Sequence, residues 1–257
     1  MYSYTSGHSK GDVYFKKGRA AAGNAIGIIV PTGFWFPPFP GNIINATTFD
    51  FPVQYKYLED VDINQQLLTT EPDSVFLKKT IQAGKELEEQ GCRAVIGCCG
   101  YFANYLTEVA EALNIPCFLS SLIQIPIIRR ALKPSQKIGI ICANGPVLVS
   151  APALKKCGVD DMSTVVIAGA EGLSQMKNVL QNTGHLDSER FEQELVDLAK
   201  KTVNKNPDIG ALLLECTEMP PYAYAIQEAT KLPVFDYTTL INWVYNAVVR
   251  RPFAGFI

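Results

Sequence analysis

The sequence predicts an α/β protein of two similar lobes, each a mostly parallel sheet flanked by helices, with the active site between them. Short apolar runs alternate with helical patterns along the chain, which is typical of parallel sheets. The segment around Cys99 recurs around Cys216 at an offset of 117 residues, and Ile-Gly-Ile-Ile at 26–29 recurs at 138–141, an offset of 112. A repeat of this length predicts two lobes related by a pseudo-twofold axis.

The elements of the first half follow from apolar runs and one amphipathic pattern. We expect strands at 25–30, 94–98 and 117–119, and helices at 74–90 and 102–113. The 74–90 segment places its apolar residues on one side and its charges on the other. A proline-rich aromatic stretch, 31–73, separates the first strand from the first helix. A loop this long is functional or carries unrecognised structure, and its Phe34-Trp35-Phe36 run predicts a pocket wall, a subunit contact or core packing.

The second half repeats this order. Strands are expected at 137–142, 211–214 and 234–235, and helices at 188–204 and 222–230. The last segment, 238–247, is helical and apolar enough to dock back onto the first lobe. These elements predict a flexible N-terminal segment at 1–24, a first lobe of 25–133 plus 236–257, and a second lobe of 134–235. Lys133-Pro134 is the expected hinge between the lobes.

Composition excludes several classes of function. The 257 residues carry a net charge of −2, which gives no electrostatic case for binding nucleic acid or an anionic membrane. No apolar run approaches the ~20 residues needed to span a bilayer. The seven cysteines include no Cys-x-x-Cys pair and only two histidines accompany them, so a metal site is not expected. We therefore expect a cytoplasmic enzyme with reduced thiols.

Cys99 and Cys216 are the strongest candidates for chemistry. Each lies just beyond the carboxyl end of a predicted strand and shortly before a helix, the rim where α/β sheets bind ligands. Two thiols facing each other across one cleft would remove a proton from one face of a carbon and return it to the other. Cys98 is the rival of Cys99, but strand alternation turns its side chain away, and its repeat counterpart is Glu215. The remaining cysteines have no mirrored partner and are assigned to packing.

Three motifs carry a resemblance to a known family. They are Gly-Cys-Cys-Gly-Tyr-Phe at 97–102, Phe-Leu-Ser-Ser-Leu-Ile-Gln-Ile-Pro at 118–126 and Leu-Leu-Leu-Glu-Cys-Thr-Glu-Met-Pro-Pro-Tyr at 212–222. From residue 25 onward the chain resembles the aspartate/glutamate racemase superfamily, which includes hydantoin racemase, arylmalonate decarboxylase and maleate isomerase. The resemblance implies a cofactor-independent isomerase that uses neither pyridoxal phosphate nor a metal.

The resemblance also implies roles for individual residues. Cys99 and Cys216 match the two catalytic cysteines, Cys99 acting on the D- and Cys216 on the L-enantiomer. The substrate-binding positions are matched by Thr32, Gly100, Tyr101, Ser120, Ser121, Asn144 and Thr217. Among these, Thr217 and the backbone at Gly100 and Tyr101 correspond to the cradle for the substrate carboxylate.

The chain also departs from its relatives in that superfamily. Glutamate racemase has histidine where this chain has Glu218, and Asn-Thr where this chain has Gly100-Tyr101. Two cysteines argue against a decarboxylase of the arylmalonate type. We therefore expect a racemase or epimerase acting at the α-carbon of a small carboxylate such as aspartate or glutamate. A maleate-type isomerase, a hydantoin racemase and a binding protein without catalysis stay open, as do the substrate side chain and a homo-oligomeric state.

Overall fold

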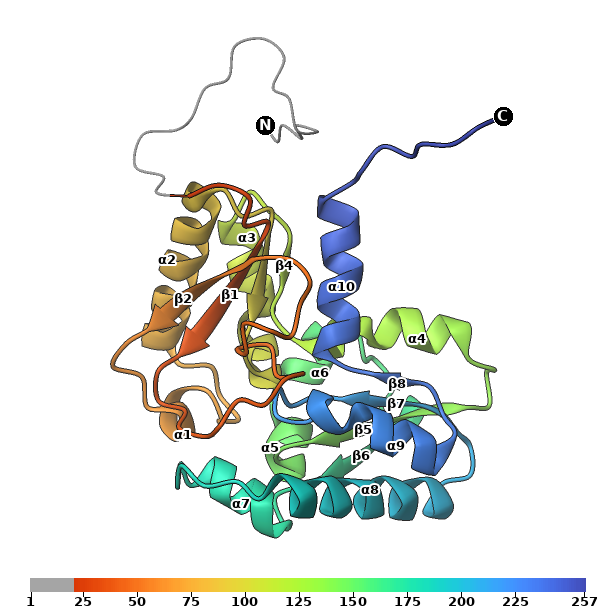
Figure 1. The fold of residues 1–257 in the computed structure, drawn as a ribbon. Helices are drawn as coiled ribbons and strands as arrows, with labels where there is room; N and C mark the ends of the chain where they lie inside the picture. Colours follow the sequence, from red (N-terminus) through yellow and green to blue (C-terminus); the bar gives the residue numbers. More distant parts are fainter. Residues whose placement is uncertain (1–20) are drawn as a thin grey trace, which may run out of the picture.

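Two four-stranded parallel sheets, one per lobe, confirm the predicted fold class (Figure 1). The structure, a computed structural model, describes residues 21–257, so most of the predicted N-terminal segment, 1–24, lies outside the described residues. The strand orders are β2-β1-β3-β4 and β6-β5-β7-β8, which is one topology used twice. The sequence repeat thus has a direct structural counterpart.

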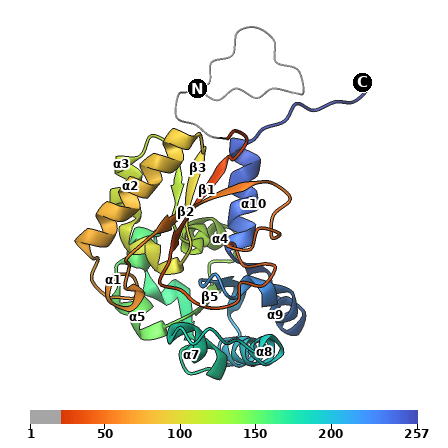
Figure 2. The same ribbon diagram turned by 60° about the vertical axis from the view of Figure 1, so that its left-hand side comes forward.

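The first sheet is sandwiched between helices on both faces. Its strands are β1 (Ile26–Pro31), β2 (Val53–Leu58), β3 (Ala94–Gly97) and β4 (Cys117–Phe118). One face carries Ile29 and Val95 and packs against α2 (Ser74–Gln90) and α3 (Leu106–Ala112). The alternate residues, Ile28 and Ile96 among them, pack against α10 (Tyr237–Val248). Figure 2 shows α10 and α2 on opposite sides of this sheet. Strand alternation therefore buries both faces.

Local signals explain where the long helix of this lobe begins and ends. The Asp73 side chain accepts a hydrogen bond from the Phe76 N–H, which caps the start of α2. Gly91, in the left-handed region with φ of 100°, ends it. The helix therefore has the bounds that the sequence predicts.

The second sheet is formed by β5 (Lys137–Cys142), β6 (Val165–Gly169), β7 (Ile209–Leu214) and β8 (Val234–Phe235). Its helices are α5 (Gly145–Ser150), α6 (Ala153–Lys156), α7 (Ser174–Leu180), α8 (Ser188–Lys205) and α9 (Ala223–Thr230). Between the lobes runs α4 (Ile125–Ala131). Cross-lobe hydrogen bonds include that of the Ser121 hydroxyl to the Leu214 carbonyl, at 3.0 Å.

The 31–73 stretch is more structured than the sequence pattern indicates. It contains β2, an edge strand of the first sheet, and α1 (Ile63–Gln66). The expected helix at 102–113 begins instead as a 3₁₀ turn, Gly100–Tyr105, before α3. Among the residues that the structure describes, no helix has both the length and the apolarity needed to cross a bilayer.

Candidate active site

Cys99 and Cys216 occupy equivalent places at the carboxyl ends of the two central sheets. Cys99 follows β3 and directly precedes the 3₁₀ turn at Gly100–Tyr105, with its backbone extended. The Tyr101 N–H hydrogen-bonds the Cys99 sulfur. Cys216 follows β7 in the same way. Both thiols are buried, with Cys99 6% exposed and Cys216 5% exposed. Cys98 is buried in the separate apolar cluster beneath α10, as strand alternation predicts.

Both thiols line one cavity between the lobes. Its walls are Phe34, Ile63, Asn64, Leu68, Cys99, Ala143, Val179, Leu180, Asn182, Cys216 and Glu218. Among the described residues, no Lys, Arg or His belongs to this lining. The free volume is about 20 Å³, enough for about one water molecule. A substrate of several heavy atoms therefore requires the walls to move apart.

The apolar walls come from segments outside the repeated sheet elements. Phe34 follows β1, and Ile63 belongs to α1. From the other lobe, α7 contributes Val179 and Leu180. Asn182 joins the two sides: its Nδ2 donates to the Gly33 carbonyl at 2.8 Å, and its Oδ1 accepts from the Trp35 N–H at 3.2 Å. These two hydrogen bonds close the cavity across the lobe boundary.

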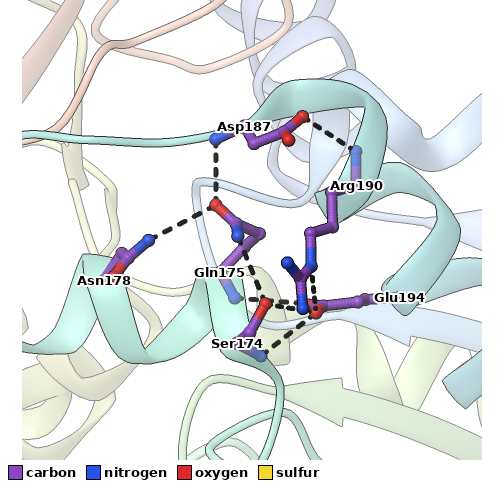
Figure 3. A network of polar contacts seen from close by, with 6 residues as sticks. All are labelled: Ser174, Gln175, Asn178, Asp187, Arg190 and Glu194. Carbon is purple, nitrogen blue, oxygen red and sulfur yellow. Dashed lines mark hydrogen bonds and ion pairs between the residues drawn. The ribbon is translucent and has the colours of Figure 1, made fainter.

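A polar network fixes α7 in this position (Figure 3). Glu194 of α8 accepts hydrogen bonds from the backbone N–H groups of Ser174 and Gln175 at the start of α7, at 3.2 and 3.0 Å. Arg190 pairs with Glu194 one helical turn away. The carboxylate thereby satisfies N–H groups that a helix start leaves unpaired. The network sets the position of the Val179 and Leu180 wall.

Glu218 is a cavity carboxylate in direct contact with a thiol. It accepts hydrogen bonds from the Cys216 thiol and from the Thr217 hydroxyl, the latter at 3.0 Å. Glu218 is 6% exposed, and burial raises its pKa above the ordinary value. The two thiols are thus unequal: the Cys216 sulfur donates to a carboxylate, whereas the Cys99 sulfur accepts from a backbone N–H.

A second buried carboxylate, Glu215, lies behind the cavity. One of its oxygens accepts from the Ala143 N–H at 3.1 Å, and burial raises its pKa to about 8. Among the described residues neither Glu215 nor Glu218 takes part in an ion pair. Burial, and next the two carboxylates, raise the pKa values of Cys99 and Cys216 well above those of ordinary thiols. Among the described residues, acidic groups therefore outnumber basic groups at this site.

Four of the predicted substrate-binding residues make hydrogen bonds to the backbone and lie outside the cavity lining. Ser121 donates to main-chain carbonyls of β7 and its neighbour, and the Ser120 hydroxyl accepts from the Leu122 N–H. Thr32 is exposed, and its hydroxyl donates to the Leu58 carbonyl at 2.9 Å. The Asn144 side chain caps α5. These four side chains do not appear in the cavity lining, because local backbone groups already engage them.

The remaining predicted positions lie close to the thiols. Tyr101 is fully buried, and its hydroxyl donates to the Asn144 carbonyl at 2.6 Å, joining the lobes. Gly100 lies against Glu215, and Thr217 supports Glu218. The sequence did not reveal Asn64, Asn182 or the apolar walls from α1 and α7 as site residues. A pocket wall was among the roles expected for the Phe34-Trp35-Phe36 run, and Phe34 lines the cavity. For the acidic groups the available signal was the pair of glutamates that brackets Cys216-Thr217.

Comparison with known proteins gives one matching family model and several relatives of similar sequence. The family model described as Asp/Glu/Hydantoin racemase matches residues 57–243. Dimethylsulfoniopropionate lyase 7 of Emiliania huxleyi (strain CCMP1516) is 32% identical over 234 residues, covering 88% of this chain and 68% of that protein. Lyase 3 of the same strain is also 32% identical, but the chain spans 61% of its length. Dimethylsulfoniopropionate lyase of Durusdinium sp. clade D is 27% identical, covering 88% of this chain and 76% of that protein.

Solved structures with the same fold share little sequence with the chain. Picrophilus torridus aspartate racemase superimposes with a TM-score of 0.58 at 15% identity, covering 90% of this chain and 96% of that one. Unliganded arylmalonate decarboxylase gives 0.53 at 17% identity, with 91% and 97% covered. Glutamate racemase from Francisella tularensis subsp. tularensis SCHU S4, in complex with D-glutamate, gives 0.53 at 16% identity, with 90% and 85% covered. At these identities the comparison concerns the fold alone.

Proposed function

The chain belongs to the Asp/Glu/hydantoin racemase family, and we propose that it is a lyase that eliminates dimethyl sulfide from dimethylsulfoniopropionate. The substrate carries a dimethylsulfonium cation at one end and a carboxylate at the other. A base removes a proton from the carbon next to the carboxylate, that electron pair forms the carbon–carbon double bond, and the carbon–sulfur bond breaks. The products are acrylate, neutral dimethyl sulfide and the proton held by the base.

One observation carries the proposal: Glu218 is buried in the cavity lining beside Cys216, and among the described residues it takes part in no ion pair. A buried carboxylate is costly unless it is protonated or paired with a cation. Because the described cavity lining contains no Lys, Arg or His, the substrate itself is the natural source of positive charge. The sulfonium group supplies it next to Glu218.

The apolar walls favour a sulfonium over an ammonium group. An ammonium group has three N–H donors, and each one left unpaired in a buried site costs about 1–3 kcal/mol. Methylated sulfonium has no such donors. It packs against apolar side chains such as Leu180, and it gains from the aromatic face of Phe34. The Asn64 amide at the cavity wall offers a donor for the substrate carboxylate at the opposite end.

The hydrogen bonds around the two sulfurs suggest which one is the base. The Cys99 sulfur receives an N–H bond, which suits a thiolate, and we assign it the removal of the α-proton. The Cys216 thiol donates to Glu218 and holds that carboxylate toward the cavity. Binding of the sulfonium adds a positive charge beside both thiols, which lowers their pKa values and promotes ionisation of Cys99.

Gas chromatography of dimethyl sulfide released from dimethylsulfoniopropionate by the purified chain tests this function. We expect release that Cys99→Ser abolishes, with one acrylate formed per dimethyl sulfide. Cys216→Ser should retain part of the activity, because elimination requires one base and a leaving group that departs without a proton. If the unaltered chain released dimethyl sulfide no faster than Cys99→Ser does, that result would contradict the proposal.

Racemisation at the α-carbon of an amino acid such as aspartate or glutamate is the second candidate. The observation that favours it is the repeat-matched pair of thiols in one cavity. Two-base racemisation requires both thiols, so Cys99→Ser and Cys216→Ser would then be equally inactive. Conversion of either enantiomer in deuterated water would give product labelled at the α-carbon from the first turnover. A protein that only binds carboxylates would show neither label nor dimethyl sulfide.

A further inference from the structure

Glu215 crosses the lobe boundary from β7 to the loop that carries Cys99. The carboxyl group is fully buried, and its Oε2 accepts from the Ala143 N–H at 3.1 Å. Its Oε1 has no hydrogen-bond partner among the described residues. Buried side-chain oxygens are rarely left unpaired, so such an atom calls for a specific explanation. The proposed elimination, as described above, leaves Glu215 without a role.

The carboxyl group fills the space in which residue 100 would place a side chain. A Cβ atom added to Gly100 would lie 1.8 Å from Oε1 of Glu215. The unpaired oxygen is therefore packed against the backbone immediately after Cys99. Cys98 is the counterpart of Glu215 in the internal repeat, and it makes the equivalent contact across the lobe boundary. Its side chain in the first lobe contacts Thr217 of the second. Each lobe thus sends the residue before its own cysteine toward the loop after the other cysteine.

The titratable groups that act on Cys99 and Glu215 become negative when they ionise. Besides Glu215, the titratable groups that act on Cys99 are Glu218 and Cys98. Glu218 also acts on Glu215. Glu215 in turn acts on five groups, namely Cys99, Tyr101, Cys142, Cys216 and Tyr237. Since no basic side chain of residues 21–257 is among the groups acting on Cys99 or Glu215, an anion on one opposes an anion on the other.

We propose that Glu215 is a positioning residue that sets the charge of the Cys99 sulfur from the opposite lobe. As a neutral acid, held by the Ala143 N–H against Gly100, it leaves Cys99 able to ionise. As a carboxylate it keeps Cys99 protonated. The inference rests on the proposed role of Cys99 as the base. Because the pKa of Glu215 is raised to about 8, the neutral acid prevails at neutral pH.

Alkylation of Cys99 by iodoacetamide, followed by tandem mass spectrometry from pH 6 to 10, tests the inference without any substrate. The variant is Glu215→Gln, which keeps the shape of the side chain and an acceptor for the Ala143 N–H but cannot ionise. We expect the midpoint for Cys99 alkylation to fall by one pH unit or more, which is about tenfold in rate between pH 8, where Glu215 ionises, and the midpoint, with little change in rate below pH 7. Glu171→Gln is the matched control, because Glu171 accepts from the Gly145 N–H in the same lobe and does not act on Cys99.

An unchanged midpoint in Glu215→Gln, or an equal shift in Glu171→Gln, would overturn the inference. Dimethyl sulfide release is measured separately, so failure of the proposed function and failure of this inference are distinguishable. If Glu215→Gln does not fold, infrared spectroscopy of the Glu218→Gln variant replaces it. We expect a protonated-carboxyl band that disappears between pH 6 and pH 8, because Glu218→Gln removes one charge that raises the pKa of Glu215, and the absence of that band at pH 6 would equally overturn the inference.

Discussion

Replacing Glu218 by glutamine measures how much of substrate recognition is electrostatic. The change removes one negative charge and keeps the size of the side chain. A unit cation about 5 Å from a carboxylate gains about 3 kcal/mol at an effective dielectric constant of about 20. The hydrogen bonds from Cys216 and Thr217 already delocalise part of this charge, so the net loss is smaller. We expect binding of dimethylsulfoniopropionate to weaken roughly 30- to 100-fold, about 2–3 kcal/mol.

The assay compares the substrate with a neutral analogue of the same shape. In 4-methylpentanoate a carbon replaces the sulfonium sulfur, so size and carboxylate are kept while the cation is lost. KM for dimethylsulfoniopropionate and the inhibition constant of 4-methylpentanoate are measured on the unaltered chain and on Glu218→Gln. On Glu218→Gln, KM for dimethylsulfoniopropionate should rise greatly, whereas the inhibition constant of 4-methylpentanoate should change little. Equal weakening of both ligands would refute the electrostatic reasoning and point to a loss of cavity shape.

Three further substitutions and one pH dependence follow from the geometry. Cys98→Ser should keep at least a tenth of the activity of the unaltered chain, because Cys98 is buried in the apolar cluster beneath α10, whereas Cys99→Ser should be inactive. Initial rates of dimethyl sulfide release check this. Asn182→Gly removes two hydrogen bonds of about 1 kcal/mol each across the lobe boundary, which should speed hydrogen exchange at 33–36. Gly100→Ala should lower Tm by several degrees, since overpacking costs about 1–3 kcal/mol, and Glu215→Ala in the same chain should recover part of it. Unaltered protein should lose stability from pH 5 to pH 8, and Glu215→Gln should lose less.

Matched control substitutions distinguish these effects from a general loss of folding. Asn178→Ala removes an amide that donates to Gln175 within α7, and it should leave hydrogen exchange at 33–36 unchanged. Gly172→Ala meets nothing within 4 Å and should leave Tm unchanged. Full activity in Cys99→Ser, unaltered exchange in Asn182→Gly, or additive effects of Gly100→Ala and Glu215→Ala would each contradict the corresponding assignment.

The two-lobed fold was accessible from the sequence because burial on both faces leaves long apolar runs. The central strands β1, β3, β5 and β7 are such runs, and they were predicted within two residues. The edge strand β2, Val-Gln-Tyr-Lys-Tyr-Leu, alternates apolar and polar residues because it is only partly buried, and it was missed within a long stretch. The other unpredicted strand, β6, is also an edge strand, whereas the short edge strands β4 and β8 were predicted. The unpredicted strands therefore both lie at sheet edges.

The candidate site was predicted at the two thiols but not around them. The internal repeat singled out Cys99 and Cys216, and both line one cavity. Hydroxyl and amide residues near strand ends were expected to face the substrate, yet Thr32 and Asn144 satisfy nearby backbone groups, as such residues often do. A single sequence cannot distinguish a buried glutamate from a solvated one. Glu215 and Glu218 were therefore visible only as neighbours of Cys216.

Retaining Glu215 in this environment reduces the stability of the fold, which is why its pH dependence is informative. Its pKa is about 8 in the folded chain and 4.5 as the ordinary value, so between these limits the folded state binds the proton more tightly. The sign follows: stability is full below pH 4.5 and is lost as pH rises toward 8, by about 4–5 kcal/mol in order of magnitude. Thermal unfolding of the unaltered chain at pH 5 and pH 8 should show this loss. In Glu215→Gln the loss should be smaller, with the remainder due to the other buried carboxyl groups of raised pKa, Glu218 and Asp236, whereas an equal loss in both proteins would place the responsible group elsewhere.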